Sequence, residues 1–487
     1  MGELHDLTAV EQAAAIRDGS LSPVEVTEHY LARIERLDAT LGAFITRTPE
    51  IARKQAAEAE TVARAARREG RGLPALYGVP VPVKDLNFVA GVRCTLGSAA
   101  YAEHVPDVDD HVVTRLRDAG TILLGKTNTP EFGLPCYTEN RLAPPARTPW
   151  DLTLSAGGSS GGAAAAVAGG LAPVAQGSDG GGSIRIPASV CGLFGIKPSR
   201  GRVSGGPVQH DVSGLSTSGP IARTVADAAT LLDVLAGPMP GLPYGAPSLP
   251  PGESFASYAG RDPGRLRVVA LPDPPVPGVE LHPDCRAAHD AAVALLRDLG
   301  HEVDELALPV DESVKTAFET VWAVMATVYP VAPHDEASLM PLTRHLRSAG
   351  AGVSGPAFAS ALYGFRALGQ LIADALLSAY DVILTPTLAK PPAAVGGLRD
   401  EADPAAEFAG LAHFTPYTPL YNATGQPAVS VPLHWTADGL PIGVMLGGRY
   451  GDDATLISLS AQLEAARPWA GRRPEVWATA GGVGGGH

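Results

Sequence analysis

Short apolar runs alternate with helical stretches and glycine-rich turns from Tyr77 onwards, and this alternation limits the fold more than any other feature. Helices are expected at Asp110–Ala119 and Val225–Leu235, the second capped by Thr224. Strands are expected at Val79–Val83, Ile122–Leu124, Leu171–Ala175 and Phe194–Ile196. Strands that alternate with helices predict an α/β layer fold with a central, largely buried sheet.

The segments before Tyr77 and after residue 238 also show patterns of helices and strands. Residues 7–70 are expected to be helical, because Thr8 with Glu11 and Ser22 with Glu25 have the spacing of capping boxes. A Pro- and Gly-rich surface connection is expected over 238–264, and an α/β unit and two helices, near 313–328 and 356–379, should follow it. Strands return at Asp381–Thr385, Ala428–Pro432 and Ile442–Leu446. The sheet is therefore expected to be left near residue 238 and rejoined near 381, within one interrupted domain.

Charge and cysteine content disfavour several classes of protein. The net charge is −14, which argues against a nucleic-acid-binding surface. The first residues, MGELHDLTAV, lack the apolar segment of a secretory signal, and no apolar run is long enough to span a bilayer. The cysteines Cys94, Cys136, Cys191 and Cys285 lie far apart, so neither a disulfide framework nor a zinc site is expected. We expect a cytoplasmic globular protein with no nucleic-acid or membrane partner.

Two serines flanked by glycines carry the strongest chemical signal. Ser159 lies in SAGGSSGG and Ser183 lies in GSDGGGSIRIPA. Gly180, Gly181 and Gly182 can adopt backbone conformations that direct several N–H groups to one point, and such a nest would stabilise a tetrahedral oxyanion. The alternative is a pair of glycine-rich turns with ordinary serines.

A serine nucleophile needs a base, and Lys84 is the main candidate. None of the 13 histidines lies in a nucleophile-elbow context, which disfavours a Ser-His-Asp arrangement. Lys84 follows the apolar run Val79–Val83, and burial there would lower the pKa of its ammonium group towards neutrality. The alternative is a lysine that reaches solvent or pairs with Asp85.

Several motifs, in the same order, resemble those of the amidase signature family of serine hydrolases. They are the Lys84 segment GVPVPVKDL, GKTNTPEFG, GGSSGG, GSDGGGSIRIPA, GIKPSRGRVS, DVILTPT and the C-terminal pair GQPAVSVPL and GLPIGV. The resemblance covers nearly the whole chain. It implies the amidase-signature fold, in which helices cover both faces of a central, mixed, twisted sheet.

The resemblance also implies a Ser-cisSer-Lys triad. Ser183 would be the nucleophile, Ser159 the bridging serine with a cis peptide bond, and Lys84 the base. Amide hydrolysis would then pass through an acyl-enzyme on Ser183, with no cofactor and no metal.

The oxyanion hole implied by the family consists of the backbone N–H groups of Gly180, Gly181, Gly182 and Ser183. The family usually has Thr, Ile or Ser at the position of Gly180. We therefore expect a more flexible nest or a more open pocket wall here. Asp179 and Arg185 are expected to pair and hold this loop.

The same resemblance implies a division of the chain. Residues 1–70 would be an N-terminal helical segment that packs on the core, and 71–237 would be the signature core. Residues 238–380 would form a linker and an inserted region that lines the substrate pocket. Residues 381–480 would complete the core, and 481–487 would be a disordered tail.

The sequence resembles in particular the nylon-oligomer cyclic-dimer hydrolases and related bacterial amidases. Those relatives can carry a cysteine near the substrate on the inserted helix, whereas the matching segment here, FETVWAVMA, has none. An aryl or aliphatic carboxamide is therefore expected rather than a cyclic dimer. The expected pocket residues are Cys136, Tyr137, Trp322, Met325 and Tyr329.

These observations predict an amidohydrolase of the linear-amide class that acts on a small, fairly hydrophobic amide. One alternative is an acyl transferase or amide-forming enzyme that uses the same acyl-enzyme. The other is a transamidosome-type subunit, which the absence of a basic patch disfavours. A homodimer is left open.

Overall fold

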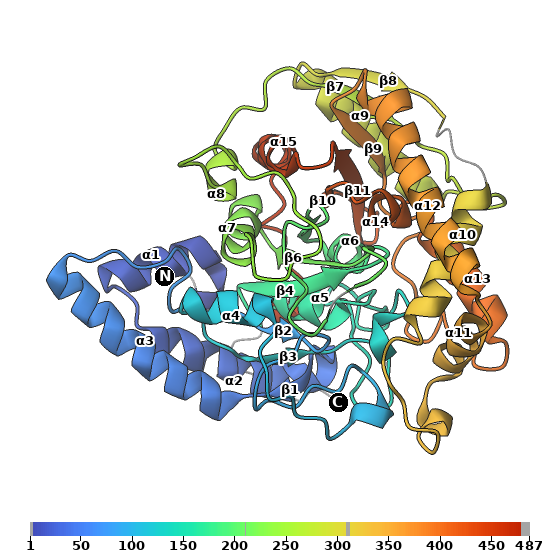
Figure 1. Ribbon diagram of the computed structural model, residues 1–487. Helices are drawn as coiled ribbons and strands as arrows, with labels where there is room; N and C mark the ends of the chain where they lie inside the picture. The colour runs from blue at the N-terminus through green and yellow to red at the C-terminus, as the bar shows by residue number, and fades with distance from the viewer. Residues whose placement is uncertain (1–2, 210, 308–311, 479–487) are drawn as a thin grey trace, which may run out of the picture.

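An eight-stranded sheet forms the centre of the molecule (Figure 1). The computed structural model describes residues 3–209, 211–307 and 312–478. In spatial order the strands are β4 (Val174–Asp179), β6 (Thr217–Ala222), β5 (Phe194–Lys197), β10 (Ala428–Trp435), β11 (Pro441–Gly448), β9 (Val382–Pro386), β7 (Arg267–Ala270) and β8 (Glu302–Glu305). Neighbouring strands from β4 to β9 are antiparallel, whereas β9, β7 and β8 are parallel, so the sheet is mixed.

Helices cover both faces of this sheet, as expected. Alternate side chains of one strand reach opposite faces, because successive residues of a strand point in opposite directions. Val174 belongs to the same buried cluster as residues of α7 (Val225–Leu235), α9 (Pro283–Asp298) and α15 (Asp453–Ala466), whereas its neighbour Ala175 belongs to the cluster that contains residues of α5 (Gly161–Ala168) and α6 (Arg185–Cys191). Each face of the sheet is thus buried under its own layer of helices.

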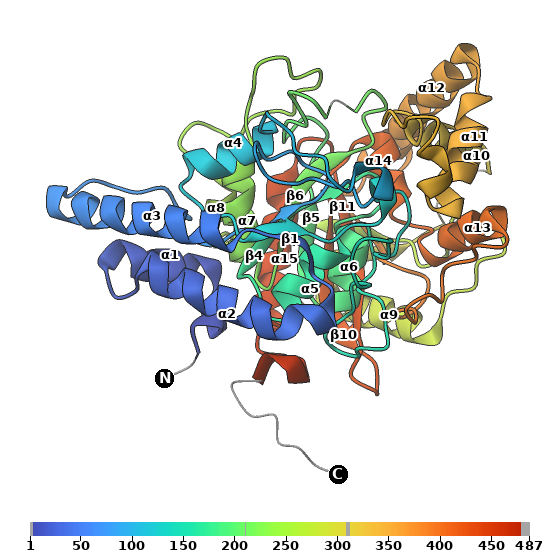
Figure 2. The ribbon, with the colours of Figure 1, turned by 90° about the horizontal axis from the view of Figure 1, so that it is seen from below.

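Two further groups of helices lie at opposite ends of the sheet. On one side are α1 (Ala9–Asp18), α2 (Pro23–Leu41) and α3 (Pro49–Glu69), and on the opposite side α10 (Glu312–Met325), α11 (Pro341–Ala351), α12 (Gly355–Ile372) and α13 (Pro404–Phe414), as both views show (Figures 1 and 2). The others are α4 (His111–Asp118), α8 (Phe255–Tyr258) and α14 (Pro419–Thr424). Both expected capping boxes are present, at the starts of α1 and α2. The helix α11 was not expected from the sequence.

A second, three-stranded sheet supports Lys84. Its strands, in spatial order, are β1 (Phe44–Arg47), β3 (Gly125–Thr127) and β2 (Val83–Lys84). The expected strands Val79–Val83 and Ile122–Leu124 are reduced to a single bridge between Pro80 and Ile122. Pro80 and Pro82 have no N–H group to donate to a ladder, which explains why the regular strand begins only at Val83.

The sheet is not left at residue 238, contrary to the expectation. The strands β7 and β8 lie between residues 238 and 380, and they extend the main sheet at its β9 edge. Only the helices α10, α11 and α12 of that region stand apart from the sheet at the end of the molecule (Figure 1). The expected disordered tail, 481–487, lies outside the described residues.

Candidate active site

Lys84, at the end of β2, is buried against the side chain of Ser159. Its Nζ lies 2.8 Å from Ser159 Oγ and 3.3 Å from the carbonyl oxygen of Ser178, and its side chain is fully buried. Burial lowers the pKa of Lys84 to about 7, against a smaller opposing effect of the Asp179 carboxylate. A substantial fraction of Lys84 is therefore uncharged at neutral pH.

The neighbouring carboxylate does not pair with Lys84. Asp85 instead accepts a hydrogen bond from Lys126 Nζ at 3.0 Å, and a second one from Thr95. Lys126 is also fully buried, which alone would lower its pKa, but the charges and hydrogen bonds of Asp85 and Cys94 together raise the pKa of Lys126. The alternative in which Asp85 pairs with Lys84 is therefore excluded.

Ser159 lies at a close approach between two backbone segments. The Gly158–Ser159 peptide bond is cis. A side chain at Gly158 would meet the backbone of Tyr137 at 2.6 Å, so glycine is required there. The next residue, Ser160, holds the turn: its Oγ donates to the carbonyl oxygen of Ser178 at 3.1 Å.

Ser183 lies in the loop between β4 and α6, and a buried ion pair holds this loop. Arg185 donates to both carboxylate oxygens of Asp179 at 2.9 Å, and both side chains are fully buried. Burial alone would raise the pKa of Asp179, but the adjacent guanidinium keeps it below its ordinary value. Asn422 donates to the Asp179 carbonyl, and Arg185 donates to the carbonyl of Thr418, so α14 and the residue before it fix the same loop.

The backbone of this loop corrects the expected oxyanion hole. The N–H of Gly182 donates to Asp179 Oδ1 at 2.7 Å, so it is used within the loop. No hydrogen bond to another described residue occupies the N–H groups of Gly180, Gly181 and Ser183. Three of the four expected donors are therefore free to meet a ligand. The carboxylate of Asp179 could not have been identified as the partner of Gly182 from the sequence alone.

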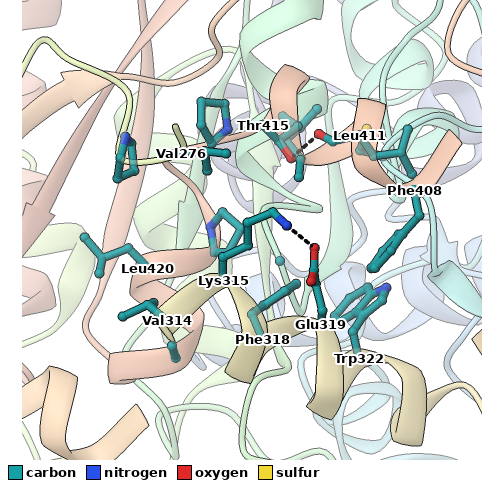
Figure 3. Close-up of a pocket in the computed structure, with 18 of the residues that line it drawn as sticks. Val276, Val314, Lys315, Phe318, Glu319, Trp322, Phe408, Leu411, Thr415 and Leu420 are labelled. Atoms are coloured by element: carbon teal, nitrogen blue, oxygen red, sulfur yellow. Dashed lines mark hydrogen bonds and ion pairs between the residues drawn. The ribbon is translucent and has the colours of Figure 1, made fainter. Parts of the chain in front are cut away.

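Two cavities meet at Ser183. The first, the polar cavity, has a volume of about 210 Å³ and is lined by Ser159, Ser178, Gly180, Asn87, Asp211 and Gln209 among others. The second, the apolar cavity, has a volume of about 130 Å³ (Figure 3). Ser183, Leu134 and Trp322 line both, so the nucleophile candidate lies at the junction between them.

The apolar cavity is built by segments far apart in the chain. Its walls come from α10, α13, α14 and the loop near Val276, as the labelled side chains in Figure 3 show. The contribution of α13 and α14, which includes Phe408, Leu411 and Leu420, was not expected from the sequence. Apolar residues on helices carry no signal that separates a pocket wall from a core position.

The expected pocket residues have mixed outcomes. Cys136 lines the apolar cavity, Met325 and Tyr329 line the polar cavity, and Trp322 lines both. Tyr137 lines neither, and this expectation is wrong. Its side chain is buried and its hydroxyl donates to Glu407 of α13, which turns it away from the cavities.

Trp322 also closes the wall that was expected to be open at Gly180. A Cβ built on Gly180 would lie 3.4 Å from the indole of Trp322, and one built on Gly181 would lie 3.3 Å from the ring of Phe318. These two aromatic rings are stacked, with centroids 5.2 Å apart. A Cβ at residue 180 would thus be in ordinary van der Waals contact with α10, which bounds the pocket wall on this side.

Metal ligands do not gather at these cavities. Within the described residues, the group of side chains that could hold a metal is Glu3, His5 and His29, and none of them lines either cavity. Burial, followed by the charge of Arg33, lowers the pKa of both histidines. Within the described ranges, none of the helices is both long enough and apolar enough to cross a membrane.

Comparisons with known proteins agree in family and in fold. The sequence model of the family described as Amidase matches residues 25–457. A putative amidase, AmiB2, of Mycobacterium tuberculosis is 41% identical over 473 residues, which cover 96% of this chain and 98% of that protein. The 6-aminohexanoate-cyclic-dimer hydrolase of Paenarthrobacter ureafaciens is 35% identical over 495 residues, covering 96% of both. The solved structure of a 6-aminohexanoate cyclic dimer hydrolase complexed with substrate has a TM-score of 0.89 and 33% identity, and covers 97% of this chain and 99% of its own.

Proposed function

The chain belongs to the amidase family, and from that premise we propose that it hydrolyses linear amides of apolar carboxylic acids through an acyl-enzyme on Ser183. The chain is an amide-hydrolysing enzyme, since its relatives over nearly their full length are amidases and related amide hydrolases. The residues that act, and the class of amide, are the parts that we propose.

The contact of 2.8 Å between Lys84 Nζ and Ser159 Oγ carries this proposal. An uncharged Lys84 accepts the hydroxyl proton of Ser159, and Ser159 accepts the proton of Ser183 as Ser183 Oγ attacks the amide carbonyl carbon. The carbonyl becomes an oxyanion, which the free N–H groups of Gly180, Gly181 and Ser183 stabilise. The proton then returns through Ser159 to the amine as the C–N bond breaks. Water attacks the ester by the same route and frees Ser183.

The position of Ser159 assigns the two cavities to the two halves of the substrate. The leaving amine must receive its proton from Ser159, and Ser159 lines the polar cavity but not the apolar one. The amine half therefore occupies the polar cavity, and the acyl half occupies the apolar cavity. Water for the second step enters on the same side as the departed amine.

Trp322 supports a linear rather than a cyclic amide. It lines both cavities, as Ser183 does, so we place the scissile bond at their junction, with the indole in the shared wall. A linear amide can place its acyl and amine halves on opposite sides of this ring. A small cyclic amide has both halves joined and would have to fit on one side of the indole.

Labelling with a fluorophosphonate, together with a substrate panel, tests this function. We expect the probe to form an adduct on Ser183, identified by mass spectrometry, and the enzyme to hydrolyse p-nitroanilides and aryl amides of apolar acids. Ser183→Ala should lose both the adduct and the turnover, whereas Ser378→Ala, at an exposed serine, should keep both. Undiminished turnover by Ser183→Ala would overturn the assignment.

Composition supports the remaining parts of the proposal. The net charge of −14 argues against nucleic-acid partners, and we propose that the substrate is a small molecule. We also propose that the enzyme acts in the cytoplasm.

A further inference from the structure

The apolar cavity contains an ion pair. Lys315 and Glu319, one turn apart on α10, line it, and Lys315 Nζ lies 2.8 Å from Glu319 Oε1 (Figure 3). The other described side chains of the lining are uncharged. Phe318 and Trp322, on the same helix, lie beside the pair in the cavity wall. A charged contact thus stands within a surface that otherwise favours hydrocarbon.

Stability of the helix does not account for this pair. Pairs four residues apart stabilise a helix weakly, and the order found here, lysine before glutamate, is the less favourable one. The two side chains are 32% and 33% exposed, so solvent reduces their attraction further. The pair therefore has more effect on what enters the cavity than on the helix itself.

We propose that Lys315 and Glu319, by pairing, cancel each other's charge in the apolar cavity, so that the cavity still takes uncharged acyl groups, an inference that rests on the assignment of this cavity to the acyl half. While the two charges are paired, they cancel, and a neutral chain meets no net charge. An acyl chain that ends in a carboxylate is repelled by Glu319, and one that ends in an ammonium group is repelled by Lys315. Either charge must separate the pair to find a partner, which costs binding energy.

The pair also conceals two opposite specificities. Glu319→Gln leaves Lys315 as an unpaired cation in the cavity, so kcat/KM for acyl chains that end in a carboxylate should rise. Lys315→Gln leaves Glu319 as an unpaired anion, so kcat/KM for acyl chains that end in an ammonium group should rise. The double variant has no charge there, and both kinds of charged chain should remain poor substrates, because an apolar wall offers a buried charge no partner.

Three matched p-nitroanilide series test the inference, with straight acyl chains of graded length that end in a methyl, a carboxylate or an ammonium group. The wild type should prefer the methyl series. In Glu319→Gln, kcat/KM for the carboxylate series relative to the methyl series should rise roughly 2- to 5-fold, the size of one partly exposed charge contact. Lys315→Gln should show the same rise for the ammonium series and none for the carboxylate series.

A matched control variant separates an effect of charge on substrate binding from a general structural effect. Glu305→Gln removes one member of an exposed ion pair with Arg297 outside both cavities, and it should leave all ratios as in the wild type. Unchanged ratios in both single variants, or an equal change in all three series, would overturn the inference while the hydrolysis itself continues. Failure of the proposed function looks different: no series is hydrolysed and Ser183 is not labelled.

Discussion

Three buried lysines surround the site, and their partners decide what each can do. Lys84 meets a serine hydroxyl, Lys126 meets the Asp85 carboxylate, and Lys197 donates to the backbone carbonyl of Pro198 at 2.9 Å. Burial, and then the charge of Arg185, lowers the pKa of Lys197 to about 7. Only Lys84 combines an uncharged fraction at neutral pH with a position in the wall behind Ser159.

Replacing Lys84 and Lys126 by methionine should have opposite effects. Lys84→Met should lower kcat/KM by about 10²–10⁴-fold, the usual contribution of a general base, and leave the free energy of unfolding unchanged or higher. Lys126→Met leaves the Asp85 carboxylate buried without a cation, so it should destabilise the fold by about 3–5 kcal/mol. Denaturant unfolding and steady-state kinetics on both variants measure these effects. The same stability loss in both variants would contradict the roles given to them.

The rate should depend on pH through Lys84. The reaction needs the uncharged amine, and the uncharged fraction grows as pH rises through the pKa of about 7. We therefore expect kcat/KM to rise with pH below that value and to level off above it. Lys197→Met is the control, because Lys197 has a similarly lowered pKa but lines neither cavity, and it should leave the midpoint in place. A profile that is flat across neutral pH would count against Lys84 as the base.

At the scale of elements, the glycine-rich loop and α10 act as one unit. The loop lacks side chains at Gly180 and Gly181, and the stacked rings of Phe318 and Trp322 fill the space above it. This packing links the region that stands apart from the sheet to the N–H groups proposed to bind the oxyanion. A Cβ at residue 180 would just touch the indole, so we expect a side chain larger than alanine there to displace it.

A double-mutant cycle tests this linkage. Gly180→Thr should cost about 1–3 kcal/mol of stability, because added atoms must displace Trp322 from a filled wall. In the background of Trp322→Ala the same threonine should cost less, since it then occupies vacated space. The unfolding free energies and kcat/KM of the four proteins measure the coupling. Strictly additive effects would show that the two positions are independent.

Several of these elements could be predicted from the sequence, and the failures have local causes. The helix at Val225–Leu235 was predicted to the residue, because Thr224 marks its start. The family, the fold class and amide hydrolysis are confirmed by the comparisons. The strand expected at Val79–Val83 is shortened to Val83–Lys84 and one bridge at Pro80, because two prolines interrupt the apolar run.

Side-chain direction in loops was the part that the sequence could not provide. Tyr137 follows Cys136 in an apolar stretch, and only contact with Glu407, 270 residues later, turns it from the cavity. Gly182 was an expected oxyanion donor until Asp179 proved to hold its N–H. In both cases a tertiary or loop contact decides which of several equivalent neighbours faces the site.

At the scale of the whole molecule, the sheet joins early and late parts of the chain. The strand β5, in the half before residue 238, pairs with β10, in the half after it, although more than 200 residues separate the two strands. The Pro- and Gly-rich connection from 238 to 253 lies between these halves and contains many exposed residues. The halves are thus held by the sheet and not by this connection.

Cleavage within this connection should therefore be tolerated. We expect a chain nicked between residues 240 and 252 to elute as one particle in gel filtration and to keep most of its activity. The fragment 1–237 expressed alone should be insoluble, because β5 would present an unpaired edge where β10 belongs. Separation of the nicked halves without denaturant would contradict this view.

The hydrogen bonds that join Thr418 and Asn422 to the loop that carries Ser183 also have a consequence for biosynthesis of the protein. Asp179, Ser183 and Arg185 are translated before the midpoint of the chain, whereas Thr418 and Asn422 emerge near its end. Until those two residues leave the ribosome, the loop has only its local contacts and lacks the hydrogen bonds to Thr418 and Asn422. The nascent polypeptide thus carries its reactive hydroxyl long before it can use it, and the enzyme becomes competent only after Asn422 has been translated.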